Sequence, residues 1–165
     1  MVINQSRAHQ RVLYEKFLKE ITVKEAVSQQ LLFPIQLHFS KIETRQLLPL
    51  QESLSNLGFV IEINEEQVKI TGIPSIMTEN GIGTILEELL RNFSEGYQTD
   101  GYTQAELMAK TLSKSLAIKV GQVLEQDSQI TLVNDLFGCK EPNLSPFQKT
   151  TFITISGDEI EKKFN

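Results

Sequence analysis

The chain has 165 residues, 40% of them hydrophobic, with a net charge of −5 at pH 7 and one cysteine, a composition typical of one soluble domain with room for two lobes. Its 16 Lys and Arg residues are scattered, which excludes a dominant electrostatic grip on DNA or RNA, and one cysteine with two histidines excludes a disulfide framework, a multi-Cys zinc site and a His-rich metal site. No apolar stretch reaches the roughly 20 residues of a membrane span and no signal peptide pattern opens the chain, so we expect a cytoplasmic protein without a membrane partner.

The first third of the chain predicts a helix, a strand and a second helix. Apolar residues recur every three to five positions over 6–21, as on one face of a helix. Alternation over 35–39 predicts a half-buried strand. A capping box at 40–43 then begins a helix that Gly58 ends, and Pro49 predicts a kink or break within it.

The rest of the chain predicts one hairpin, several helices and a late strand. In chain order these are a hairpin over 59–70, a helix over 84–93 capped by Thr84, a helix over 103–121, a helix capped by Asp127 or Ser128 and ended by Gly138, a strand over 150–155 and a helix over 157–164. The strands are few and no regular βαβ units join them. The sequence therefore predicts an α+β fold rather than a doubly wound sheet.

Three stretches, in this order, resemble motifs of a known family. Residues 4–15 read NQSRAHQRVLYE, residues 113–121 read SKSLAIKVG, and residues 144–155 read LSPFQKTTFITI. They are similar to D-Q-H-A-x-x-E-x-x-x-x-E, to A-C-x-S-A-I-K-A-G and to C-P-H-G-R-P followed by a β-branched strand. Over nearly its whole length the chain resembles the C-terminal domain of the MutL proteins of DNA mismatch repair.

The resemblance also implies that a metal site has degenerated. In MutL proteins that nick DNA, these motifs supply acidic, thiolate and imidazole ligands to a divalent metal. Here only Glu15 keeps a carboxylate, and the other ligand positions are held by Asn4, Ser6, Gln10, Lys114, Ser145 and Phe147. Next to them, Gln148 stands at the position of the motif's Gly and Lys149 at that of its Arg. One carboxylate cannot hold a divalent ion tightly, so we expect a domain without nuclease chemistry, metal or cofactor.

A fourth short motif is Gln29-x-Leu31-Leu32-x-Pro34. It matches the peptide by which bacterial proteins dock on the polymerase sliding clamp. The Gln amide would fix one end by hydrogen bonds, the two leucines would fill a pocket, and Pro would hold the segment extended. In the alternative interpretation, Leu31, Leu32 and Phe33 are core residues of the strand that follows.

The resemblance implies a two-lobed domain that assembles as a homodimer. The dimerisation lobe would comprise 1–29 and 111–165, and the inserted outer lobe 30–110. Its function would be to hold two MutL subunits together, so that ATPase domains outside this chain meet at high effective concentration. The partners would be the sliding clamp and other mismatch repair proteins, with DNA bound only weakly. Candidates for the dimer interface, some of which must face the core, are Phe152, Ile153, Ile155, Ile160 and Phe164. In relatives, further strands precede this region. We expect that without them one edge of the sheet is exposed here.

Two other classes of function stay open. The first is a metal-dependent DNA nuclease with a site rebuilt around Glu15, His9 and Asp127. The second is an interaction module unrelated to repair. We interpret His9 as a surface or partly packed side chain, because no partner ligands accompany it. His38 alternates out of the apolar face of its strand, so we expect it to be solvent-facing or packed on a neighbour. Cys139 has no His near it in the sequence, which indicates a buried or idle thiol.

Overall fold

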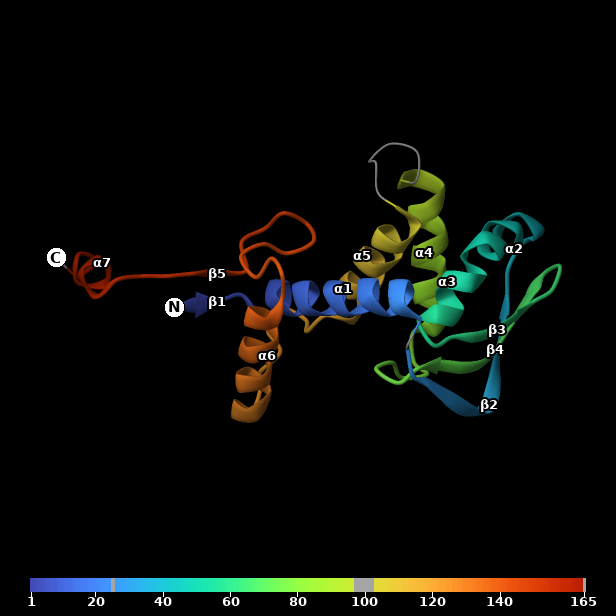
Figure 1. Ribbon diagram of the computed structural model, residues 1–165, viewed down its shortest axis with the longest axis horizontal. Helices are drawn as coiled ribbons and strands as arrows, with labels where there is room; N and C mark the ends of the chain where they lie inside the picture. The colour runs from blue at the N-terminus through green and yellow to red at the C-terminus, as the bar shows by residue number, and fades with distance from the viewer. Residues whose placement is uncertain (25, 97–102, 165) are drawn as a thin grey trace.

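The computed structural model describes residues 1–24, 26–96 and 103–164, and it shows an elongated molecule arranged along one long helix, α1 (Figure 1). The strands are β1 (Val2–Ile3), β2 (Ser28–His38), β3 (Val60–Ile63), β4 (Gln67–Pro74) and β5 (Phe152–Ile153). The helices are α1 (Gln5–Val23), α2 (Lys41–Leu47), the 3-10 turn η1 (Leu48–Leu50), α3 (Gln51–Asn56), α4 (Ile82–Gly96), α5 (Gln104–Leu116), α6 (Gln126–Gly138) and α7 (Gly157–Glu161). Helices with two small antiparallel sheets confirm the predicted α+β class.

The larger sheet has three antiparallel strands in the order β2-β4-β3. The predicted hairpin is confirmed as β3 and β4, joined by a turn at 64–66. Strand β2 is longer than the alternation over 35–39 predicted, because it begins at Ser28 and pairs with the far end of β4. Its register shifts between Gln30 and Ile35, so that residues 31–34 bulge out of the ladder.

Side-chain caps mark the N-terminal ends of four helices, α1, α2, α5 and α7. The capping box of Ser40 and Glu43 is present, and a second one, formed by Thr103 and Glu106, begins α5. Pro49 lies in η1, which breaks the predicted long helix into α2 and α3.

Several predicted boundaries were wrong. The strand predicted over 150–155 is only Phe152–Ile153, and the last helix ends at Glu161 rather than at residue 164. Thr84 does not cap α4 but lies inside it, since the helix begins at Ile82, whose buried side chain extends the apolar face by one turn. Helix α5 ends at Leu116 rather than near residue 121, because Ala117 is extended and the chain leaves the helix axis there. The N-cap of α6 is Glu125, which makes no side-chain capping bond, rather than Asp127 or Ser128.

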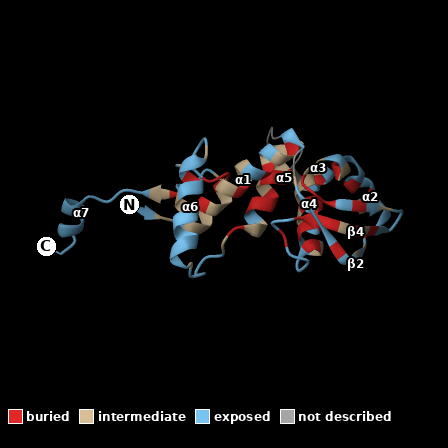
Figure 2. Ribbon diagram, turned by 60° about the horizontal axis from the view of Figure 1, so that its bottom comes forward, coloured by how far each residue is buried: buried red, intermediate tan, exposed pale blue. Residues whose placement is uncertain are grey.

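The buried residues form two clusters, one at each end of α1 (Figure 2). The larger joins the second half of α1 to the three-stranded sheet and to α2–α5. The smaller joins Ala8 of α1 to Leu132 and Leu136 of α6, with Ile3 and Phe152 packed against it. The predicted border between lobes, at 110/111, falls inside α5, and the division into lobes stays a prediction.

Strands β1 and β5 and helix α7 extend beyond the smaller cluster (Figure 1). We call β1, β5 and 154–164 the terminal arm. Within the described residues, none of the helices is both long enough and apolar enough to cross a membrane.

Candidate functional site

The junction between β1 and α1, where the first motif lies, is built as a helix cap. Asn4 is extended and its side-chain oxygen accepts the Arg7 N–H at 3.1 Å, which caps α1. The Asn4 N–H donates to the Thr151 carbonyl at 2.8 Å, continuing the ladder in which Val2 pairs with Ile153. Ser6 lies in the first turn of the helix and Gln10 one turn further on, both half-buried.

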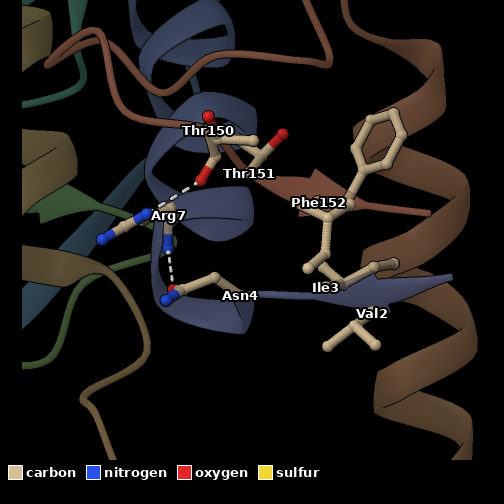
Figure 3. Close-up of a pocket in the computed structure, with 8 residues that line it drawn as sticks. Val2, Ile3, Asn4, Arg7, Thr150, Thr151 and Phe152 are labelled. Atoms are coloured by element: carbon tan, nitrogen blue, oxygen red, sulfur yellow. Dashed lines mark hydrogen bonds between the residues drawn. The ribbon is translucent and has the colours of Figure 1, made fainter. Parts of the chain in front are cut away.

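A shallow pocket of about 280 Å³ lies between this cap and β5 (Figure 3). The Arg7 guanidinium donates to the Thr150 carbonyl at 3.1 Å across one side of it, and the Phe152 ring points away toward α6. The pocket is lined by residues of β1 and β5 and by the two threonines before β5. Arg7 contributes its one charged side chain and Asn4 its one amide side chain.

Glu15, the acidic residue of the first motif, is engaged in structural contacts. Its two oxygens accept the backbone N–H groups of Lys140 and Glu141, at 2.8 and 3.3 Å. The buried guanidinium of Arg11 lies 3.5 Å from Glu15 and 3.2 Å from Glu141, and it also donates to the Leu144 carbonyl. These bonds fasten the segment after α6 to the side of α1, so Glu15 serves as a structural hydrogen-bond acceptor. Sequence reasoning missed the role of Arg11, because two of its partners, Glu141 and Leu144, are at least 130 residues away in sequence.

The third motif forms a tight loop whose ends meet in a β-bridge between Leu144 and Thr150. Ser145 is completely buried, and its hydroxyl accepts the N–H groups of Phe147 and Lys149, each at 3.3 Å. Gln148 adopts a left-handed conformation with φ of 57°, which favours glycine. The loop therefore keeps a glycine-type backbone, while the Ser145 hydroxyl serves backbone groups within the loop.

His9 is a hydrogen-bond acceptor rather than a free base. Its Nδ1 accepts the Ile118 N–H at 3.0 Å, which holds the segment after α5 against α1. Burial lowers the pKa of His9, and the charge of Asp135 only partly opposes this. His38 is exposed at the end of β2, as its place in the alternation predicted.

The remaining proposed nuclease residues are not brought together. Asp127 lies in the first turn of α6, and Asp135, the carboxylate that acts on His9, is eight residues further on, about 12 Å along a helix. Cys139 is half-buried, and burial with the nearby Glu15 carboxylate raises the pKa of its thiol to about 11, so a thiolate is disfavoured.

The donor set does not fit a divalent metal. Of the positions that the sequence analysis expects to be degenerate, Lys114 is exposed on α5 and Phe147 is half-buried in the loop. An ammonium group and a phenyl ring are not ligands of a divalent metal ion. Across 1–24, 26–96 and 103–164, no three His, Cys, Asp or Glu side chains are grouped so that they could hold a metal ion.

The short motif at 29–34 coincides with the bulge in β2. Gln29 pairs with Ile73 in the ladder. Leu31 is buried, with 9% of its surface exposed, whereas Leu32 is 91% and Phe33 80% exposed. Pro34 is exposed beside them. The predicted pair Leu31–Leu32 is therefore split between the core and the surface, and the adjacent exposed apolar pair is Leu32–Phe33.

The five residues proposed for a dimer interface fall into two groups. Phe152 packs toward the core, with its ring centroid 5.2 Å from that of Phe137. The other four, Ile153, Ile155, Ile160 and Phe164, are 52%, 41%, 50% and 87% exposed. Helix α7 has a Ser156–Glu159 capping box but no buried residue.

Comparison with known proteins places these features in a family. The sequence model described as "MutL C terminal dimerisation domain" matches residues 1–124. Over 165 residues, 99% of its length, the chain is 48% identical to the DNA mismatch repair protein MutL of Christiangramia forsetii, of which it covers 27%. It is 44% identical to the MutL of Flavobacterium psychrophilum (100% of this chain, 27% of that protein) and 33% identical to that of Bacteroides fragilis (99% and 26%). The chain thus spans about a quarter of the length of these relatives.

Proposed function

The chain belongs to the family of MutL C-terminal dimerisation domains, and on this premise we propose that it joins two copies of a mismatch repair protein through its terminal arm. The observation that carries this proposal is the exposure of apolar side chains on an element that has no core of its own. The arm consists of two paired strands of two residues each and a helix with no buried residue. Such short elements are only marginally stable when isolated in water. A second copy packed on the arm would bury Ile153, Ile155 and Ile160.

The dimer is symmetric in this proposal, with the same patch used by both copies. Both lobes proposed from the sequence, 1–29 with 111–165 and 30–110, are retained, and the arm belongs to the first. In the whole protein, such a joint would keep the ATPase domains of two chains near each other.

Sedimentation equilibrium of this chain tests the proposal. We expect a dimer of twice the 18.7 kDa monomer mass at micromolar concentration. A monomer throughout the micromolar range would refute it.

We also propose that the bulge of β2 docks on the sliding clamp. The motif Gln29-x-Leu31-Leu32-x-Pro34 and the exposure of Leu32 and Phe33 at the bulge support this. Because Leu31 is buried, the apolar contact would come from Leu32 and Phe33 unless the bulge rearranges on binding.

A binding assay with purified bacterial sliding clamp tests the docking. Leu32→Ala with Phe33→Ala should weaken binding at least tenfold, whereas a matched pair outside the bulge, Val120→Ala with Val123→Ala, should have little effect, although these valines are about 90% exposed. Equal affinities for the wild type and the bulge variant would reject the proposal.

Finally, we propose that this domain does not nick DNA. Two contacts support this. Backbone N–H groups donate to the Glu15 carboxylate, and the Ile118 N–H donates to the His9 ring. A supercoiled plasmid incubated with high concentrations of protein and Mn²⁺ should stay intact. Nicking that Glu15→Ala abolishes, while the variant still folds, would instead support the rebuilt nuclease site.

A further inference from the structure

We propose that the dimer exchanges its terminal arms, so that the exposed apolar side of α6 in each copy receives the arm of the other copy. The inference rests on the proposed dimer and adds to it the surface on which the arm is seated. The occupant of that surface is the segment 153–164 of a second copy of this chain.

One side of α6 is apolar and exposed. Ile130, Val133 and Phe137 are spaced by three and four residues, so they form one stripe along the helix. Ile130 and Phe137 are 51% and 47% exposed, whereas Leu132 and Leu136 on another side of α6 are buried against α1. Helix α6 therefore has two apolar sides, and its own chain covers only one of them well.

The arm carries apolar side chains that its own chain leaves exposed. Side chains alternate along an extended chain, so Ile153 and Ile155 point away from the side on which the Phe152 ring faces α6. Ile160 lies on α7 and Phe164 in the turn that follows it, and both are exposed. The arm thus offers an apolar surface that can pack on the stripe of α6.

The two surfaces adjoin each other in each copy. Phe137 ends the stripe of α6, and the centroid of its ring lies 5.2 Å from that of Phe152, where the arm begins. The arm then runs away from α6, so that α7 lies at its far end (Figures 1 and 2). A twofold axis close to these two rings brings each arm past the α6 of the other copy and covers both surfaces at once.

Contact between the two arms alone would cover less apolar surface. It would leave the stripe of α6 in water, and it would join two short elements that have no core of their own. In an exchange, each arm is seated on a helix whose other side is already fixed in the smaller cluster, so fewer groups must be ordered on binding.

Charge does not select the partner surface. Helix α6 contains Asp127 and Asp135 and no basic residue. The arm ends in two lysines beside Phe164, but it also holds three carboxylates: Asp158, Glu159 and Glu161. Apolar contact therefore carries the exchange, and added salt should weaken the dimer little.

Cross-linking between two single-cysteine variants tests the exchange. Both variants carry Cys139→Ser, which keeps a hydrogen-bond donor for the Asp135 carbonyl. One adds Asn134→Cys beside the stripe on α6, and the other adds Lys163→Cys beside the last phenylalanine of the arm; both positions are exposed. After the two proteins are mixed and re-equilibrated, a short bismaleimide should give a cross-linked dimer from the mixture but not from either variant alone.

Two other arrangements give different products. A cross-linked dimer from Lys163→Cys alone would show that the arms pair with each other. An internal cross-link in a monomer that carries both Asn134→Cys and Lys163→Cys would show that the arm folds back on its own α6. Either product overturns the exchange. The control mixture replaces Lys163→Cys with Lys41→Cys on α2, far from the arm, and should give no cross-linked dimer.

Sedimentation equilibrium separates this inference from the proposed dimer. Ile130→Asp should raise the dissociation constant at least about tenfold, because the exchange buries an unpaired charge there, whereas Ile42→Asp on α2 should leave it unchanged. Equal constants for the two variants, in a chain that still dimerises, refute the exchange and leave the dimer in place. A monomeric wild type refutes both.

Discussion

Truncating Ile153 on β5 should weaken the proposed dimer by about 30-fold. Burying a whole aliphatic side chain contributes about 1.5–3 kcal/mol, and 52% of Ile153 is exposed in the single chain. Ile153→Ala should therefore cost about 1 kcal/mol in each copy if the partner covers the exposed part. A symmetric interface counts the change twice, and about 2 kcal/mol corresponds to a roughly 30-fold higher dissociation constant.

Sedimentation equilibrium over a concentration series gives the dissociation constant of the dimer directly. The matched control is Ile42→Ala on α2, which truncates an isoleucine that is 70% exposed but lies far from the terminal arm. We expect the control to dimerise like the wild type, and thermal melting should confirm that both variants fold. If Ile153→Ala and Ile42→Ala have equal dissociation constants, the arm is not the interface.

Three further predictions concern the stability of the single chain. Leu31→Ala should lower the free energy of unfolding by about 2–4 kcal/mol in urea titrations and Leu32→Ala by less than about 0.5, because the first is buried and the second is 91% exposed; equal effects would contradict the bulge. Gln148→Gly should raise the melting temperature by about 2–4 °C by relieving a left-handed conformation, and an unchanged or lower value would argue against it. Since burial lowers the pKa of His9, the unfolded chain binds its proton more tightly, so the free energy of unfolding should fall as the pH drops below about 6.5 in urea titrations; His9→Asn should remove that part of the slope, and a slope that persists in this variant would assign the effect elsewhere.

The sequence predicted elements whose causes are local. The Ser40–Glu43 capping box, the break at Pro49 and the β3–β4 hairpin depend on residues within a few positions of one another, and each is confirmed. The end of α5 could not be predicted in this way, since the Ile118 N–H leaves the helix for the side chain of His9, 109 residues away in sequence. Likewise, the early start of β2 depends on pairing with the far end of β4.

The candidate site shows the same division between local and distant causes. The residue type at each motif position can be read from the sequence alone. What those residues contact could not be read, since the Arg11–Glu15–Glu141 cluster and the approach of Lys110 to Phe147 join segments separated by more than 30 residues. Folding also brings Arg7 of α1 and Lys110 of α5 to the loop 144–150, two contacts that the order of residues in the chain does not indicate.

The loop 144–150 holds one residue in an unfavourable backbone conformation. At Gln148 the backbone is left-handed, and that conformation costs about 1 kcal/mol or more for a residue with a Cβ. The cost is tolerated because other interactions hold the loop: the Ser145 hydroxyl accepts two of its N–H groups, and Arg7 fastens Thr150 to α1. Since Asn4 donates to the Thr151 carbonyl next to that contact, the loop also sets the pairing of β1 with β5. The geometry of this loop therefore supports the terminal arm, which is a structural role for the left-handed residue that does not depend on a bound metal.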